Sequence, residues 1–211
     1  VYSALGHLYV KALPNGTPRR LTTQSDHWEF HPSWSRDGGS IVYTTWNDST
    51  LGSVRIVSAG GGAGRVVTRT PGHYVEPALS PDGATVVYRA TTGGYLFSTA
   101  WARDPGIYQV PSKGGPATLV SRHGQLPQFG VASDRVYLTD VNGADEDERS
   151  IFSIDLAGAH ERTHVKGVYF TEARLSPDEK WIAFREKYKV WVAPAVRAGR
   201  PVDIGPGMKD L

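Results

Sequence analysis

The 211-residue sequence contains no cysteine and one methionine, and its charges almost cancel. Without cysteine the chain cannot form a disulfide scaffold, a thiolate zinc site or a cysteine nucleophile. Its 23 basic and 21 acidic side chains leave a net charge of +2, so no nucleic-acid partner is expected. No apolar run approaches the ~20 residues that cross a bilayer, so no membrane insertion is expected. The first residues, Val1 to His7, lack the basic and apolar regions of a signal peptide, and the start resembles a cut in a longer chain.

Glycine and proline, by contrast, are abundant, with 24 and 14 copies, and aromatic residues make up 10% of the chain. Short apolar or alternating stretches, such as residues 41–43, 86–88 and 182–184, are bounded by Gly, Pro, Asp or Ser. Such stretches are typical of strands joined by tight turns. The helical candidates, 144–150 and 186–190, are too short and too charged to form a core. The sequence therefore predicts an all-β protein.

An internal repeat organises the chain. Residues 31–43, 76–88 and 172–184 align with one another, and residues 126–137 form a fourth, degraded copy. Each copy ends in an aromatic residue, at Tyr43, Tyr88, Tyr137 and Phe184, which gives steps of 45, 49 and 47 residues. A period in the mid-forties with four strands per unit is typical of a β-propeller blade. A β-sandwich with coincidental turns accounts less well for four copies of one pattern.

The repeat carries its own turn chemistry, clearest in Ser80-Pro81-Asp82-Gly83. Proline presets φ, aspartate hydrogen-bonds to its own backbone, and glycine adopts a positive φ. The turn is predicted to join the innermost strand of a blade to the second strand. The aromatic residue that ends each copy is then expected to pack between adjacent blades, as are the tryptophans other than Trp101.

The unit Pro-x-Φ-Ser-Pro-Asp-Gly-x-x-Φ-Φ-aromatic, where Φ is apolar, resembles the WD40-like (PD40) repeat of TolB-like propellers, and the resemblance covers residues 7–205. Residues 74–89 and 181–194 are similar to the propeller that precedes a metal-dependent amidohydrolase domain in large bacterial proteins. The third copy departs from the pattern, with Gly130 in the serine position. The resemblance implies a periplasmic or secreted propeller that does not itself catalyse a reaction.

The repeats predict a single partial propeller over residues 1–211. Residues 7–23 supply the outer strands of an incomplete blade, and blades follow at 27–70, 73–121, 123–165 and 168–205. That makes about four and a half blades, whereas propellers of the resembling family usually have six- or seven-bladed rings. Open blade edges associate readily. We therefore expect the chain to be part of a larger ring or to associate through its open edges.

Two motifs of hydrolases are missing from the sequence. It has no Gly-x-Ser-x-Gly elbow and no His-x-His pair. Residues 160–164 do have the His-Glu-x-x-His spacing, but they lie outside the helical candidates, and this motif binds a metal when both histidines lie on one face of a helix. The glycine-rich residues 60–64 lie between two expected strands without a following helix, so they indicate a hairpin and not a phosphate-binding loop. No catalytic residue and no cofactor is predicted. The sequence leaves open whether the parent protein is an enzyme of the amidohydrolase kind.

Two segments suggest metal sites at first sight. In His27-Trp28-Glu29-Phe30-His31 the two histidines and the carboxylate alternate, and an extended strand would point all three the same way. Because Pro32 follows, we interpret the segment as a loop whose polar groups line the channel mouth. Residues 140–148 are acidic, but their glycine does not have the EF-hand spacing, so a solvated hairpin is expected. No metal is predicted at either segment.

The candidate binding site is a collar of polar residues. His31, Glu76 and Glu172 each precede the innermost strand of a blade, and Leu126 holds that position in the third blade. Such residues surround the mouth of a propeller channel, where they would bind a partner or ligand or simply hydrate the channel. Residues 91–105, which include Trp101, are a second candidate interface.

Three functions follow from these observations. The first is a protein-interaction or substrate-gating module attached to an amidohydrolase-like hydrolase. The second is a stand-alone periplasmic scaffold that binds other proteins. The third is a propeller enzyme with its active site at the channel mouth.

Overall fold

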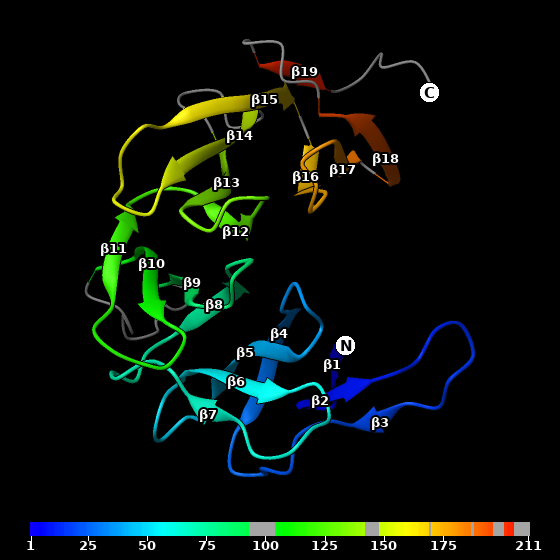
Figure 1. Ribbon diagram of the computed structural model, residues 1–211, viewed down its shortest axis with the longest axis vertical. Helices are drawn as coiled ribbons and strands as arrows, with labels where there is room; N and C mark the ends of the chain where they lie inside the picture. Colours follow the sequence, from blue (N-terminus) through cyan, green and yellow to red (C-terminus); the bar gives the residue numbers. More distant parts are fainter. Residues whose placement is uncertain (93–103, 142–147, 169, 187, 196–200, 205–211) are drawn as a thin grey trace. The chain divides into compact units, whose positions relative to one another are not determined.

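The computed structural model describes residues 1–92, 104–141, 148–168, 170–186, 188–195 and 201–204, which form strands, turns and connecting loops (Figure 1). Within these ranges there is no helix, and so none that could cross a membrane. The strands form five small sheets of the kind that make up β-propeller blades. The predicted all-β propeller class is therefore confirmed.

The chain divides into two compact units, and the first spans Val1–Arg122. It contains three antiparallel sheets, in which strands that follow one another in the chain lie side by side. The first sheet holds β1 (Tyr2–Ala4), β2 (His7–Val10) and β3 (Arg19–Arg20); the second holds β4 (Trp28–Trp34), β5 (Ser40–Trp46), β6 (Val54–Ser58) and β7 (Arg65–Val66); the third holds β8 (Tyr74–Leu79), β9 (Thr85–Ala90), β10 (Gly106–Pro111) and β11 (Thr118–Ser121).

The second unit, His123–Leu211, contains two sheets. One holds β12 (Gln125–Phe129), β13 (Arg135–Val141), β14 (Glu148–Asp155), β15 (Arg162–Val168) and β19 (Val202–Ile204); the other holds β16 (Phe170–Leu175), β17 (Trp181–Glu186) and β18 (Lys189–Pro194). Strand β19 lies parallel to β15, whereas every other pair is antiparallel. In the described part of its sheet β18 is an edge strand, with Val190 and Val192 exposed.

The aromatic residues that end the repeats lie where two sheets of the same unit share a core. Tyr43 packs with Leu8, Tyr88 packs with Val42, and Tyr137 packs with Phe184. All four aromatic side chains are buried. Their predicted place between neighbouring blades is confirmed, since each cluster draws residues from two sheets. The tryptophans differ, because Trp28, Trp34 and Trp181 are 41–54% exposed and so do not mainly fill these cores.

The Ser-x-Asp turns have the predicted geometry. The hydroxyl of Ser80 donates to Oδ1 of Asp82 (2.6 Å), which also accepts the N–H of Ala84 (3.0 Å), and Gly83 has φ +70°. The turns at Ser35 and Ser176 repeat these bonds. The serine bond also lowers the pKa of the exposed Asp37 and Asp178 carboxyls. Each turn is therefore closed by its own side chains.

Blade three lacks this turn, and its neighbour supplies a replacement contact. Glu179 stands where the other turns have glycine and keeps the same left-handed backbone (φ +59°). Its Oε1 accepts the N–H of Val131 (2.9 Å) in the degraded turn. A Cβ on Gly130 would lie 1.9 Å from that same oxygen. The two departures from the repeat thus fit together, since a serine at 130 would push the glutamate away.

Candidate functional site

The predicted collar position has one backbone geometry in all four repeats. His31, Glu76, Leu126 and Glu172 have φ between +49° and +56°. Each lies at an irregularity in the pairing of its sheet's first two strands, between Phe30 and Ser33 in β4 and at the equivalent points of β8, β12 and β16. A non-glycine residue in this conformation is strained by about 1–3 kcal/mol and persists only where its surroundings hold it. The bulge turns the collar side chain out of the strand's normal alternation.

Each polar collar residue is bound by the residue that follows the aromatic end of its repeat. His31 Nδ1 shares a hydrogen bond with Thr44 Oγ1 (3.1 Å). Glu76 accepts two bonds from Arg89, from Nε (3.0 Å) and from Nη2 (2.7 Å). The third pair, Glu172 and Arg185, has an Nη2–Oε1 distance of 3.2 Å. The collar is therefore a set of cross-strand pairs, in which the two carboxylates each face a guanidinium.

This pairing changes the electrostatics expected from the carboxylates alone. Each glutamate is balanced by the arginine paired with it, so each of these two collar positions offers both signs and has no net negative charge. The arginines were missed at the sequence level although their signal was present: both lie 13 residues after their glutamate. In the third repeat both positions are leucine, at 126 and 138, so the pair there is apolar.

His31 is close to the Glu76 pair within the first unit. Burial of its ring by surrounding atoms lowers the pKa of His31 below 6.5, and Glu76 offsets this only in part, while His73 and Arg89 lower it further. The imidazole is therefore neutral at pH 7. At this pH the collar residues of the first unit carry one ion pair and one neutral ring.

The segment from His27 to His31 is not the loop that the sequence suggested. Strand β4 begins at Trp28, and the bulge at His31 breaks the alternation that would have aligned the three polar side chains. His27 and Glu29 are buried, while His31 reaches the surface. The predicted lining of the channel mouth is therefore wrong for His27 and Glu29.

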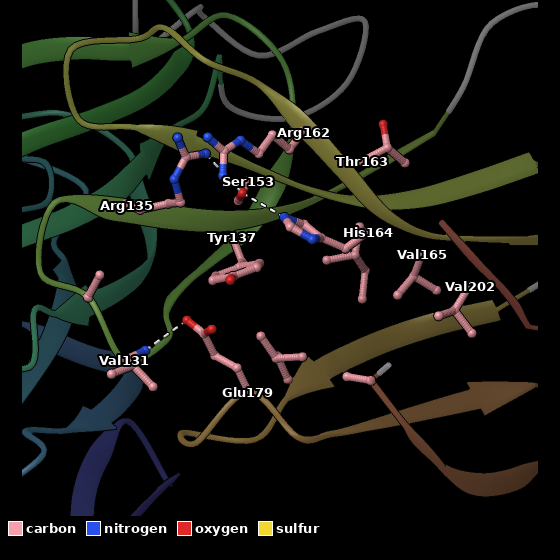
Figure 2. Close-up of a pocket in the computed structure, with 14 residues that line it drawn as sticks. Val131, Arg135, Tyr137, Ser153, Arg162, Thr163, His164, Val165, Glu179 and Val202 are labelled. Carbon is pink, nitrogen blue, oxygen red and sulfur yellow. Dashed lines mark hydrogen bonds between the residues drawn. The ribbon is translucent and has the colours of Figure 1, made fainter. Parts of the chain in front are cut away.

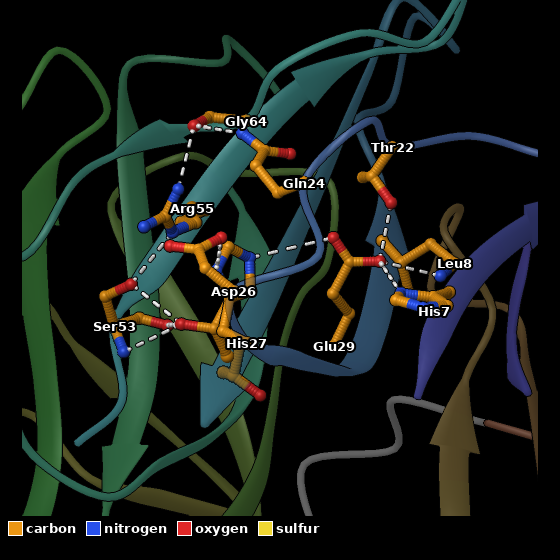
Figure 3. Close-up of polar contacts among 12 residues, drawn as sticks. His7, Leu8, Thr22, Gln24, Asp26, His27, Glu29, Ser53, Arg55 and Gly64 are labelled. Atoms are coloured by element: carbon orange, nitrogen blue, oxygen red, sulfur yellow. Dashed lines mark hydrogen bonds and ion pairs between the residues drawn. The ribbon is translucent and has the colours of Figure 1, made fainter. Parts of the chain in front are cut away.

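Glu29 instead ties the first sheet to the second (Figure 3). Its carboxylate is fully buried, and Oε2 accepts the N–H of Leu8 (2.9 Å) and the hydroxyl of Thr22 (2.5 Å). His7 Nδ1 and His27 Nε2 each lie 3.8 Å from a carboxylate oxygen, too far for hydrogen bonds. Among the described residues, no group of three or more His, Asp or Glu side chains is arranged to hold a metal ion. The hydrogen bonds of Glu29 therefore join β4 of the second sheet to β2 of the first sheet.

The remaining candidates from the sequence fall mostly on positions that the structure does not describe. Trp101 and residues 93–103 of the expected insertion lie outside the described residues, as do residues 142–147 of the acidic segment. His123 Nδ1 lies 2.7 Å from Asp140 at the start of that segment. The second candidate interface therefore stays a prediction.

Acid is expected to destabilise the first unit. Burial lowers the pKa of His27, His31 and His73, with Arg55 adding to the effect at His27 and Arg89 at His73. Their unfolded forms bind protons more readily, so the free energy of unfolding should fall as the pH drops below about 6.5, by up to about 1.4 kcal/mol per pH unit for each proton. Urea unfolding followed by tryptophan fluorescence from pH 7.5 to 5 measures this slope. His27→Gln should reduce the slope, and an unchanged slope would exclude His27 as its source.

Comparisons with known proteins agree with the architecture. No family model matches the chain. The Tol-Pal system protein TolB of Bordetella pertussis is 38% identical over 68 residues, which are 32% of this chain and 14% of that protein. The structure of a putative TolB from Agrobacterium tumefaciens superposes on 85% of the chain with a TM-score of 0.67 and 16% identity, and that match covers 62% of the TolB chain. TolB from Acinetobacter baumannii gives 0.70 and 20% identity over 90% of this chain and 46% of its own. The chain thus has a TolB-like propeller fold and spans only part of the proteins that it matches.

Proposed function

We propose that the chain is a protein-interaction module whose binding surface includes the collar residues His31, Glu76 and Glu172. The observation that carries the proposal is the repeated, strained collar geometry, with polar side chains on three of four blades. Strain of this kind gathers at ligand-binding positions. The similarity to TolB, a protein named for the Tol-Pal system, supports a protein partner over a small substrate.

The pairing within the collar suits a partner that presents both charges. Glu172 and Arg185 are 64% and 47% exposed, so water already solvates them and little desolvation opposes contact. A partner's lysine or arginine would bind the carboxylate while its aspartate or glutamate binds the guanidinium.

We include in this proposal that the module belongs to a larger protein. The sequence resemblance favours an amidohydrolase-like hydrolase as the attached domain. The exposed edge of β18 is a further surface through which the chain would associate.

Photo-cross-linking tests this surface directly. p-Benzoylphenylalanine at position 172 should give an adduct with a discrete protein in extracts of the source cells. The same residue at position 148, a partly exposed glutamate outside the collar, serves as the matched control. Adducts that are equal at the two positions, or absent at 172, would refute the collar as the binding surface.

Removing both carboxylates should weaken binding without unfolding the protein. We expect Glu76→Ala with Glu172→Ala to lower the affinity for the cross-linked partner about tenfold, equivalent to ~1.4 kcal/mol. The exposed Glu172–Arg185 pair contributes only about 0–1 kcal/mol, and the less exposed, bidentate Glu76–Arg89 pair contributes more, so the variant should remain folded with a lowered melting temperature. Glu148→Ala with Glu161→Ala removes the same charge elsewhere and should leave affinity unchanged. Unaltered affinity in the collar variant, or its unfolding, would make these residues structural.

A further inference from the structure

The second unit contains a cavity of about 600 Å³ between its two sheets (Figure 2). Its walls come from β13, β14 and β15 on one side, and from Leu175, Glu179 and Ala195 of the β16–β18 sheet on the other. This volume is within the range of sites that bind small organic molecules. The cavity lies away from the collar position of either sheet, because no collar residue lines it.

The floor of the cavity is apolar. Tyr137, Ile151 and Val165 are almost fully buried and yet face it, and Leu175 and Val202 extend the same surface. Water in such a space makes few hydrogen bonds, so an apolar group that replaces it gains free energy. The floor therefore suits the hydrocarbon or aromatic body of a ligand.

One wall carries positive charge. Arg135 begins β13 and Arg162 begins β15, and both side chains line the cavity. Among the described residues neither has a carboxylate within 4.0 Å, and the side chain of Arg162 makes no hydrogen bond or ion pair there. The one carboxylate in the lining, Glu179, comes from the other sheet and already accepts the N–H of Val131. The wall thus offers guanidinium donors without a counter-ion.

A hydrogen-bonded chain holds Arg135 in place. Its Nη1 donates to Ser153 Oγ (3.0 Å) and to the carbonyl of His160 (2.9 Å), and Ser153 Oγ shares a bond with His164 Nε2 (2.7 Å). Ser153 is buried, and its hydroxyl group is held between Arg135 and His164, so this chain positions the arginine. A guanidinium fixed in this way loses little side-chain entropy when it binds an anion.

We propose that this cavity binds a small organic anion with an apolar body and a single carboxylate or sulfonate group. The apolar body would occupy the floor at Ile151 and Val165, and the acidic group would lie against Arg135 and Arg162. The site is independent of the proposed protein-binding collar, so either proposal can fail without the other.

The test uses 1-anilinonaphthalene-8-sulfonate as the fluorescent probe on the full 211-residue chain, with decanoate and decanol as competitors. We expect saturable binding of one probe per chain. Decanoate should displace it at a concentration at least tenfold lower than that of decanol, since the two have the same ten-carbon chain length and differ in the head group, a charged carboxylate against a neutral hydroxyl group. A probe that does not saturate, or equal displacement by the two competitors, would overturn the proposal.

Variants place the binding in the cavity. Arg162→Gln, which removes no side-chain hydrogen bond or ion pair within the described part of the chain, should weaken the probe and decanoate about tenfold and leave decanol unchanged. Thr163→Glu should add a repelling charge to the lining and weaken them further. Arg69→Gln, an exposed arginine of the first unit, is the charge-matched control, and urea unfolding verifies that every variant is folded. Unchanged affinity in Arg162→Gln would overturn the assignment.

Discussion

Replacing Glu29 with leucine is expected to lower the free energy of unfolding by about 3–5 kcal/mol, the range for removing one partner from a buried charged group. The carboxylate is fully buried and accepts bonds from Leu8 of the first sheet and from Thr22, just after β3. Leucine has a similar volume but no acceptor, so it leaves a buried N–H and a buried hydroxyl without partners. Each such group costs about 1–3 kcal/mol. Urea unfolding, followed by tryptophan fluorescence, gives the free energy directly.

Glu29→Gln separates the loss of charge from the loss of acceptors. Its amide oxygen can still accept from Leu8 and Thr22, so this variant should retain more than half of the stability that leucine loses. Glu161→Leu, at a half-exposed position, should change the free energy by less than about 0.5 kcal/mol. If glutamine were as damaging as leucine, the negative charge itself, facing His7 and His27, would be the important property of Glu29.

Most of the fold could be predicted from the sequence, because four copies of one repeat indicate the same blade structure. The Ser-x-Asp turn specifies a hairpin. The aromatic residue that ends each repeat specifies a core shared by two sheets. Both features are local in the chain. Strand β19 was harder to place. It was assigned to the blade at 168–205, yet it hydrogen-bonds to β15 of the preceding sheet. A three-strand sequence pattern does not say which of two open edges a short strand joins.

The chemistry of the site was less visible, because it depends on pairs that are distant in sequence. Glu76 was recognised at a binding position, but its bidentate partner Arg89 follows 13 residues later, across the hairpin. Glu29 was interpreted as lining a channel mouth, since nothing near it in the sequence shows that β4 buries it beneath Leu8 and Thr22. The bulge at His31 was equally hidden, because a positive φ is uncommon at any residue other than glycine.

Substitution of Gly52 should lower the free energy of unfolding almost as much as substitution of Glu29, for a steric reason. Gly52 and Gly72 exchange two backbone hydrogen bonds of 3.0 Å, which join the loop after β5 to the loop after β7. A Cβ on Gly52 would lie 2.3 Å from the carbonyl oxygen of Thr45 and 2.6 Å from that of Gly72. Both obstacles are backbone atoms, so a change of side-chain rotamer cannot relieve them.

Gly52→Ala is therefore expected to cost about 3 kcal/mol, the upper part of the usual range for overpacking. Gly60→Ala is the matched control in the same unit. There the added Cβ meets only Ser58 Oγ at 3.6 Å, and the backbone is not left-handed. By restricting the unfolded chain, this control should stabilise the protein by about 0.4–1 kcal/mol. Urea midpoints that move in opposite directions would support the glycine bridge as a structural joint, whereas equal midpoints would show that the loops at 52 and 72 separate at no cost.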